Sequence, residues 1–390
     1  IHNKQISDYV TLKPIDPWYR FIFDDGTNFD YVSSLEKTIA NISLISKKDA
    51  SNYSKMLEAS KNIYDLAFTD LADKPFHSFS FMVKQLPALI KFRANRSVFS
   101  FISSYFQNDK IRRAFSIQPL LVGGNPFTTT CIYSLIHFLE RQHGVYFAMG
   151  GTGALVKALT KLMLEIGIKV NLNTTIEKIN VNNKRIEKIV DQNGKDRKAD
   201  YYISNIDPLY LYNNLIKPKN SFLLRYKKKY ARYSMGLFVL FFGTKIKYTK
   251  VKHHTILFGK QYKELLENIF VNKKISDDIS IYLHRPTATD DSFAPKGCDS
   301  FYALVPVPNL DSNINWEHEG NKFKNNIINM LDKTILNNLK GNIVDDFFMT
   351  PKSFEKDYLA FKGTGFSVAP FFTQSAWFRF HNKSEEIKNL

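Results

Sequence analysis

Residues 120–159 read "LLVGGNPFTTTCIYSLIHFLERQHGVYFAMGGTGALVKAL" and contain two helical patterns, each preceded by a pair of glycines. The first, "CIYSLIHFLERQHG", predicts a helix because Thr128–Thr130 offer N-cap oxygens before it and Gly144 ends it. The second begins at "GGTGALVKAL" and predicts a helix with Thr152 as its N-cap and an apolar face from Leu155 to Ile166. This stretch therefore predicts a helical unit built between glycine turns.

The glycine pairs raise the question of whether the stretch binds phosphate. Helix N-termini with free N–H groups bind anions, and "GGTG" at 150–153 precedes a helix. However, neither pair belongs to a G-x-G-x-x-G turn or to a Walker lysine motif. We therefore interpret Gly123 and Gly124 as residues that allow a tight backbone turn, with Pro126 fixing the start of the helix that follows.

Composition and charge set the class of protein. The chain has 390 residues, 44% hydrophobic and 23% charged, which excludes an intrinsically disordered protein and allows a large core. Lysine and arginine exceed aspartate and glutamate by 17, which favours nucleic acid, acidic lipid headgroups or a phosphorylated cofactor as partner. A single basic run such as "RYKKKY" (225–230) is more typical of a solvated face. Cys131 and Cys298 form no CxxC pair, so a reducing cytoplasm is the simplest compartment.

Residues 75–106 mix phenylalanine and aliphatic residues with lysine and arginine and contain no acid. This composition is typical of segments that lie in a membrane interface, but an ordinary helical cap whose lysine stems extend outward fits equally well. No apolar run reaches the ~18–20 residues that a transmembrane helix needs. The longest, "MGLFVLFFG" (235–243), fits a strand better.

The remaining chain alternates strand-rich and helical blocks. Residues 18–32 predict a hairpin with its turn at Asp24–Gly26. Period-two patterns predict strands over 168–204, including "ADYYIS", and again over 232–308, and a helix is expected over about 316–340.

No catalytic or metal motif stands out by spacing, and no metal site is predicted. His253 and His254 are adjacent, and adjacent residues on a strand point to opposite faces. His137, Glu140 and Arg141 fall on one helix, where such a group is more typical of a satisfied polar cluster than of a general acid–base set. Composition and spacing alone therefore leave the function open.

The stretch 120–159 closely resembles the bacterial and fungal phytoene desaturases, a family of FAD-dependent carotenoid oxidoreductases. Further segments resemble the same family in the same order, among them "LKPIDPWYRFIFDDG", "ANRSVFSFISSYF", "HHTILFGKQYKELLENIF", "SIYLHRPTATDDSFAPKGC", "YALVPVPNL" and "FSVAPFFTQSAWFRFHN". The resemblance covers essentially the whole chain.

The resemblance implies a mixed α/β fold: an amine-oxidase-like flavoprotein with a Rossmann-type FAD domain and an interleaved substrate domain of mixed β-sheet and helical cap. It assigns residues 1–145 to the substrate domain with the membrane-facing segment 75–106, residues 146–215 to the FAD domain, 216–345 to the substrate-domain sheet, and 346–390 to a return towards the FAD domain. The family's N-terminal GxGxxG unit and C-terminal glycine-rich segment do not occur here. We therefore expect a fragment of a longer enzyme, inactive and poor at binding FAD on its own.

The resemblance also implies site residues. FAD contacts are expected at Gly150, Gly151 and Thr152, at the boundary between flavin and substrate, and at Ile176, beside the adenine. The substrate cavity is expected to lie against Gly123, Gly124, Asn125, Pro126 and Phe127. No catalytic residue is implied.

The implied reaction is FAD-dependent dehydrogenation of phytoene to a more conjugated carotene such as lycopene, in carotenoid biosynthesis. The flavin accepts the hydride, so the lack of a catalytic dyad is expected. The implied partners are the carotenoid and an anionic membrane surface, not nucleic acid, with the protein peripheral at the inner face of the membrane. The alternatives are a related carotenoid isomerase, ketolase or C30 desaturase, and, in another class, a non-enzymatic basic lipid-binding protein.

Overall fold

The computed structural model describes residues 4–71, 73–74, 76, 78–216 and 222–390. The strands are β1 (Leu12–Pro14), β2 (Tyr19–Ile22), β3 (Asn28–Tyr31), β4 (Tyr146–Ala148), β5 (Ile176–Asn182), β6 (Arg185–Asp191), β7 (Asp196–Arg197), β8 (Gly236–Thr244), β9 (His254–Leu257), β10 (Ile281–His284), β11 (Asp299–Val307) and β12 (Ile343–Met349). The helices are α1 (Leu35–Ile45), α2 (Lys47–Ala50), α3 (Tyr53–Tyr64), α4 (Phe79–Lys84), α5 (Leu86–Lys91), α6 (Val98–Ser103), α7 (Asp109–Phe115), α8 (Leu135–His143), α9 (Gly151–Glu165), α10 (Pro208–Tyr210), α11 (Phe222–Tyr230), α12 (Tyr262–Glu267), α13 (Trp316–Thr334), α14 (Leu339–Asn342) and α15 (Pro351–Tyr358).

A seven-stranded mixed sheet forms the centre, in the order β12-β8-β11-β10-β9-β2-β3. The expected hairpin is confirmed: β2 pairs antiparallel with β3, and Gly26 has φ +81° in the turn. β2 also pairs in parallel with β9, which lies more than 230 residues further along the chain. The sheet therefore combines two strands from the first part of the chain, β2 and β3, with strands from its second half.

β8 is buried on both faces because its side chains alternate between two cores. Leu237 and Val239 belong to the core shared with α3, α6 and α7, whereas Phe238 packs edge-to-face on Phe323 of α13, with ring centroids 5.0 Å apart. A strand covered on both sides is expected to be continuously apolar, which explains "MGLFVLFFG".

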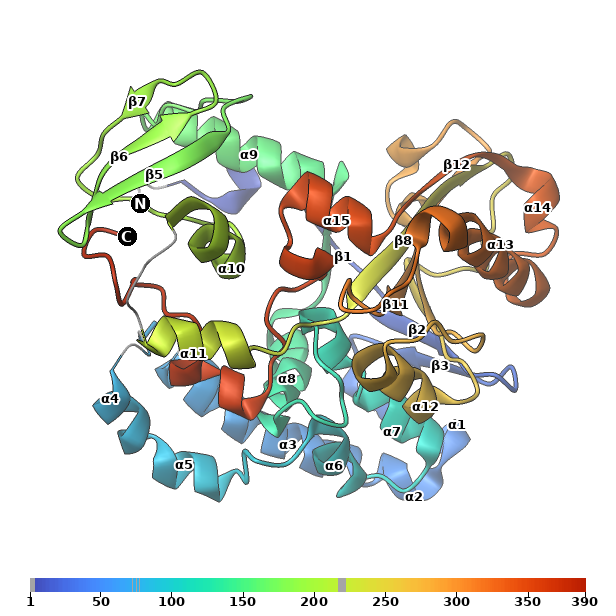
Figure 1. Ribbon diagram of the computed structural model, residues 1–390. Helices are drawn as coiled ribbons and strands as arrows, with labels where there is room; N and C mark the ends of the chain where they lie inside the picture. The colour runs from blue at the N-terminus through green and yellow to red at the C-terminus, as the bar shows by residue number, and fades with distance from the viewer. Residues whose placement is uncertain (1–3, 72, 75, 77, 217–221) are drawn as a thin grey trace.

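The structure has a second, separate sheet of three strands, β5-β6-β7, which lies with α9, α10 and the C-terminal end at the upper left of Figure 1. The helices from α1 to α8 form a layer at the bottom of the same view, and α13 and α14 cover the seven-stranded sheet at the right. This arrangement agrees with the expected mixed fold, while the domain boundaries given above stay predictions.

Residues 78–103 form the short helices α4, α5 and α6 of the helical layer. Residues 75 and 77 of the segment 75–106 lie outside the described residues. Within the part of the chain that is described, no helix is both long and apolar enough to cross a membrane.

Two local predictions are corrected. The N-cap of α9 is Gly150, at φ +82°, a conformation that favours glycine, and Thr152 lies inside the first turn. The apolar face expected on α9 is largely exposed, with Leu159 54% exposed. The "ADYYIS" segment forms no strand: β7 ends at Arg197 and the backbone is irregular beyond it.

Candidate functional site

The corner at Gly123 and Gly124 is a place where two distant backbones approach each other. Gly123 has φ +80°, and a Cβ on it would lie 2.5 Å from the Cβ of Phe366. A Cβ on Gly124 would collide with the Thr129 side chain and lie 2.7 Å from Pro370 Cγ. The interpretation of a tight turn is confirmed. Glycine is required both by the backbone conformation of the turn and by the close approach of Phe366 and Pro370, which leaves no room for a side chain.

Asn125, Pro126 and Phe127 continue the corner and connect it to α6. The Asn125 side-chain oxygen accepts a hydrogen bond from the Phe127 N–H at 2.9 Å, and the Pro126 carbonyl accepts one from the Phe99 N–H at 2.9 Å. The Phe127 ring packs on Phe99, with centroids 4.4 Å apart, and on Tyr262 at 6.0 Å. Residues 123–127 do not line either of the two cavities described next, and their contact with substrate stays a prediction.

An apolar cavity of about 280 Å³ lies directly beyond this corner. Its wall comes from residues 63–92 of the helical layer, from 130–135 and from 372–376, and includes Leu89, Ile132 and Phe372. Among the described residues that line it, none carries a charge; the polar ones are Gln85, Thr130, Tyr133 and Ser375. A cavity of this kind favours a hydrocarbon over a polar ligand.

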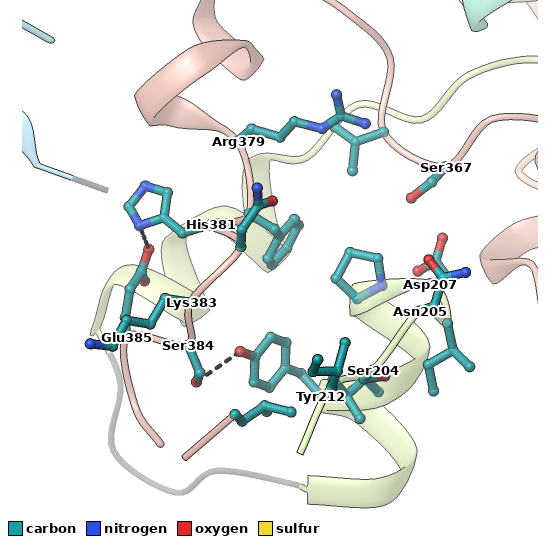
Figure 2. A pocket seen from close by; sticks show the side chains of 18 of the residues that line it. Ser204, Asn205, Asp207, Tyr212, Ser367, Arg379, His381, Lys383, Ser384 and Glu385 are labelled. Atoms are coloured by element: carbon teal, nitrogen blue, oxygen red, sulfur yellow. Dashed lines mark hydrogen bonds and ion pairs between the residues drawn. The ribbon is translucent and has the colours of Figure 1, made fainter. Parts of the chain in front are cut away.

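A larger cavity of about 1090 Å³ lies between the segment 201–212, the segment 358–368 and the C-terminal residues 379–390. Asp207 caps α10 with Oδ1, which accepts from the Leu209 N–H at 2.9 Å, while its Oδ2 is buried and has no hydrogen-bond partner among the described residues. Arg379 reaches across the cavity towards Ser367 in Figure 2. The guanidinium of Arg379 makes no hydrogen bond or ion pair within the described part of the chain.

Two contacts visible in Figure 2 hold the C-terminal segment at the wall of the larger cavity, one at the bottom of the view and one at its left. The Tyr212 hydroxyl donates to Ser384 Oγ at 3.0 Å, and His381 Nδ1 lies 2.8 Å from Glu385 Oε1. The sequence reasoning missed this cavity; the Asp-Pro pair at 207–208, a helix-start signal, was the available hint.

The residues expected to contact FAD fall into two places. Gly150, Gly151 and Thr152 lie together at the start of α9, where the Gly150 N–H donates to Asp290 Oδ2 at 2.7 Å. Ile176 lies at the start of β5 and pairs with Asp191. None of the four lines the larger cavity, and their contact with FAD stays a prediction.

His137 and Glu140 are buried on α8 and Arg141 is half-buried. The expected satisfied cluster is only partly found, because Glu140 Oε2 and Arg141 Nε have no hydrogen-bond partner among the described residues. His137 Nε2 lies 2.9 Å from the Phe115 carbonyl oxygen, and burial lowers the pKa of His137 to about 4. Arg141 donates to the carbonyl oxygens of Val32 (2.9 Å) and Ser33 (2.6 Å), so it does not pair with Glu140. Burial raises the pKa of Glu140 to about 7.

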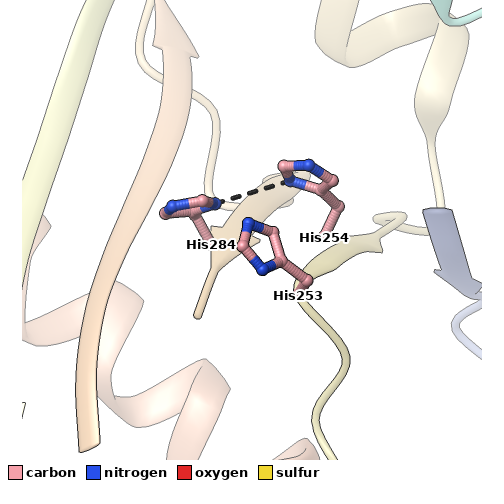
Figure 3. Close-up of side chains that lie close together, drawn as sticks. All are labelled: His253, His254 and His284. Atoms are coloured by element: carbon pink, nitrogen blue, oxygen red, sulfur yellow. Dashed lines mark hydrogen bonds between the residues drawn. The ribbon is translucent and has the colours of Figure 1, made fainter. Parts of the chain in front are cut away.

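The expectation that His253 and His254 point to opposite faces is wrong. Strand β9 begins at His254, so the alternation of a strand does not apply to His253, and the two ring centroids are only 4.5 Å apart. His284, at the end of β10, pairs directly with His254, and Figure 3 shows the three rings facing one another. Burial lowers the pKa of His253 to about 4, of His254 to about 2 and of His284 to about 3.

Comparison with known proteins identifies the family. The flavin-containing amine oxidoreductase family matches residues 3–271. A lycopene-forming phytoene desaturase of Pantoea ananas is 38% identical over 390 residues, which cover all of this chain and 79% of that protein. A neurosporene-forming phytoene desaturase of Rhodobacter capsulatus is 35% identical over 98% of this chain and 74% of its own length. A 4,4'-diapophytoene desaturase of Methylomonas is 30% identical over 99% of this chain and 76% of its own length.

Solved structures share the fold. Cyclohexylamine oxidase from Brevibacterium oxydans superimposes with a TM-score of 0.54 at 9% identity, over 94% of this chain and 73% of its own. An oxidoreductase from Methanosarcina mazei gives 0.56 at 13% identity, over 87% and 70%. These structures confirm the expected amine-oxidase-like fold. The match to the flavin-containing family supports the expected cofactor, FAD. The chain belongs to the flavin-containing amine oxidoreductase family and, within it, to the phytoene desaturase-type proteins.

Proposed function

We propose that the protein desaturates phytoene to a more conjugated carotene such as lycopene in carotenoid biosynthesis. The observation that carries this proposal is the 38% identity to a lycopene-forming phytoene desaturase along the entire chain. The apolar cavity supports it, because a C40 hydrocarbon offers no charge or hydrogen-bonding group and must be held by shape and burial alone.

The residues around the larger cavity fit a flavin dinucleotide. The buried and unpartnered Oδ2 of Asp207 accepts a hydrogen bond from a hydroxyl or ring N–H, and FAD carries both. The Arg379 guanidinium, a cation on the same cavity, matches the charge of a pyrophosphate. When bound, FAD supplies the acceptor for the hydride removed from the substrate.

The part left to the protein is binding and exclusion of water. Phe92, Ile132 and Leu135 would bury a part of the hydrocarbon chain and keep water away from it, since a cavity of about 280 Å³ is too small for a whole C40 molecule. The reaction needs no acidic or basic side chain in this cavity to hold a proton. This agrees with the lack of charged residues among the described residues of its wall.

Product analysis tests the function. Cells that accumulate phytoene and express the protein are expected to form lycopene or another carotene with more conjugated double bonds, resolved by chromatography and absorption spectrum. Conversion of only a C30 precursor would favour a diapophytoene desaturase, which the 30% identity to the Methylomonas protein makes the second candidate. No new carotenoid from cells that express the full-length protein, together with no flavin absorbance in that protein once purified, would favour the non-enzymatic lipid-binding class.

A substitution that fills the apolar cavity tests where the substrate binds. Ala67→Trp places a large ring among the lining residues and is expected to lower product formation by at least about tenfold without loss of flavin absorbance. Leu44→Trp, at a position 85% exposed on α1, is the matched control and is expected to leave product formation unchanged.

We also propose that the protein works as a peripheral protein on the inner face of the membrane, docking through α4 and α5. Phe79 and Ile90 are 58% and 73% exposed on these helices, and Lys84, Lys91 and Arg93 are exposed beside them. Exposed apolar side chains next to cations are typical of helices that lie on anionic lipid. Some of the same residues, such as Leu89 and Phe92, line the apolar cavity, so a substrate dissolved in lipid would have a short path.

Flotation with lipid vesicles tests this docking. The variant Lys84→Glu/Lys91→Glu/Arg93→Glu is expected to lose most of its binding to vesicles of anionic phospholipid, because each cation near the surface contributes about 1 kcal/mol. Arg96, which is half-buried, is left unchanged.

The matched control reverses the same number of charges on exposed lysines of α13, α14 and α15: Lys333→Glu/Lys340→Glu/Lys356→Glu. Equal loss of flotation in both triple variants would show that net charge alone drives binding and would contradict docking through α4 and α5.

A further inference from the structure

We propose that His253, His254 and His284 form a binding site for one divalent transition-metal ion of the zinc type. The site is built by strand pairing: β9 and β10 are antiparallel neighbours, their register places His254 opposite His284, and His253 precedes the strand by one residue. One nitrogen from each of the three imidazoles lies within 4.8 Å of the other two, as Figure 3 illustrates. This proposal does not depend on the proposed desaturase activity.

The distances between the ring nitrogens fit a tetrahedral ion. His254 Nδ1 and His284 Nδ1 are 3.5 Å apart. Zinc–nitrogen bonds of about 2.0–2.1 Å place neighbouring ligand nitrogens of a tetrahedral site roughly 3.4 Å apart. His253 completes the set, since one of its ring nitrogens lies within 4.8 Å of the ligand nitrogens of His254 and His284.

The hydrogen bonds of His253 point to a missing partner. Its side chain is 4% exposed, and its Nδ1 lies 2.6 Å from Thr289 Oγ1, which fixes one side of the ring. Its Nε2 is buried and has no hydrogen-bond partner among the described residues. A ring held by one nitrogen while the other stays bare is the usual arrangement of a metal-ligating histidine and its supporting hydrogen bond.

The surroundings admit a cation of this class. Arg285, which follows His284 in the chain, is neutralised by Asp299, whose carboxylate accepts from Arg285 Nε at 2.9 Å and Nη2 at 3.1 Å. The Tyr282 hydroxyl lies 2.6 Å from His254 Nδ1, and this hydrogen bond must give way when that nitrogen binds the ion. Three imidazoles without a carboxylate select zinc, cobalt, nickel or copper over magnesium or calcium.

The site would clamp the loop after β10 to the start of α9. The Phe147 ring of β4 packs on His253 with centroids 4.7 Å apart. Thr289, which contacts His253, is followed by Asp290, which accepts the hydrogen bond from the Gly150 N–H. A bound ion would therefore fix the segment 253–290 beside the glycines at 150–151.

Metal titration of the full chain tests the site. Protein stripped with a chelator is titrated with Co²⁺ as a spectroscopic probe and with Zn²⁺ in competition with a chromophoric chelator. We expect about one equivalent of metal per chain and an intense visible Co²⁺ spectrum typical of tetrahedral coordination. His284→Gln and His253→Gln are each expected to weaken binding by at least about tenfold.

His318→Gln is the matched control, because His318 is exposed on α13, far along the chain from the cluster. Circular dichroism shows whether each variant is folded. The Co²⁺ spectrum of the unmodified chain tests the metal site even if a variant does not fold. Binding well below one equivalent, a weak spectrum typical of octahedral cobalt, or equal loss in His318→Gln would each overturn the proposal and leave a hydrogen-bonded histidine cluster.

Discussion

Replacing Glu140 with glutamine is expected to stabilise the protein at pH 8 and to leave its stability at pH 5 nearly unchanged. Glu140 is 5% exposed on α8, and one of its carboxylate oxygens accepts a hydrogen bond from the Tyr19 hydroxyl at 3.1 Å. The other oxygen is buried and has no partner among the described residues. Glutamine keeps the hydrogen bond from Tyr19 and removes only the ionisation.

The sign and size of the effect follow from the pKa of Glu140. Burial raises this pKa from 4.5 to about 7 in the folded protein. The unfolded chain therefore releases the proton first, and the folded state loses stability as the pH rises from 4.5 to 7, after which the loss is complete. The difference corresponds to about 3 kcal/mol. For a chain of this length the entropy of unfolding is about 0.8 kcal/mol/K, so the expected shift in melting temperature is about 4 °C.

Thermal unfolding at pH 5 and pH 8, followed by circular dichroism, measures this difference for the wild-type protein and for Glu140→Gln. Glu58→Gln, on the exposed side of α3, is the matched control and is expected to change neither melting temperature. If Glu140→Gln melted at the wild-type temperature at pH 8, or shifted equally at both pH values, the assignment of a buried, ionisation-sensitive carboxyl would be wrong.

Three further changes separate packing, cofactor binding and charge pairing. Gly124→Ala is expected to destabilise the protein by about 1–3 kcal/mol through overpacking, whereas Gly153→Ala, with open space at its Cβ, is expected to be neutral in the same melting experiment. Asp207→Asn keeps the Oδ1 that caps α10 and replaces the unpartnered acceptor with a donor, so it is expected to reduce flavin retained after gel filtration, measured by absorbance, with little change in melting temperature of the flavin-free protein. Asp299→Ala leaves the Arg285 guanidinium buried without its partner and is expected to cost about 3–5 kcal/mol in chemical unfolding; a cost below about 1 kcal/mol would contradict a buried pair.

Much of the secondary structure could be predicted because its signals are local. Gly26 carries the positive φ that the hairpin turn requires, and Gly144 and Gly167 adopt positive φ where α8 and α9 were expected to end. The apolar run of β8 was also sufficient to predict a strand, and the periodicity of α13 was sufficient to predict a helix. The prediction failed at Thr152, where a capping residue type was present but the N-cap lies two residues earlier, at Gly150.

The candidate sites were less predictable. Resemblance to the family was enough to give the fold and the cofactor, but not the cavities, whose walls combine segments up to some 300 residues apart in the chain. Asp207 and Arg379 carry no spacing signal that relates one to the other, since only folding brings them to the same cavity.

By itself the sequence determined the turns, the helix ends, the buried strand and the family, because each depends on residues close together in the chain or on their order. The tertiary structure alone decided that Gly124 has no room for a side chain, because Pro370 lies against it. It also decided that His254 meets His284, because strand register is set by the packing of a whole sheet and not by the residues that it brings together.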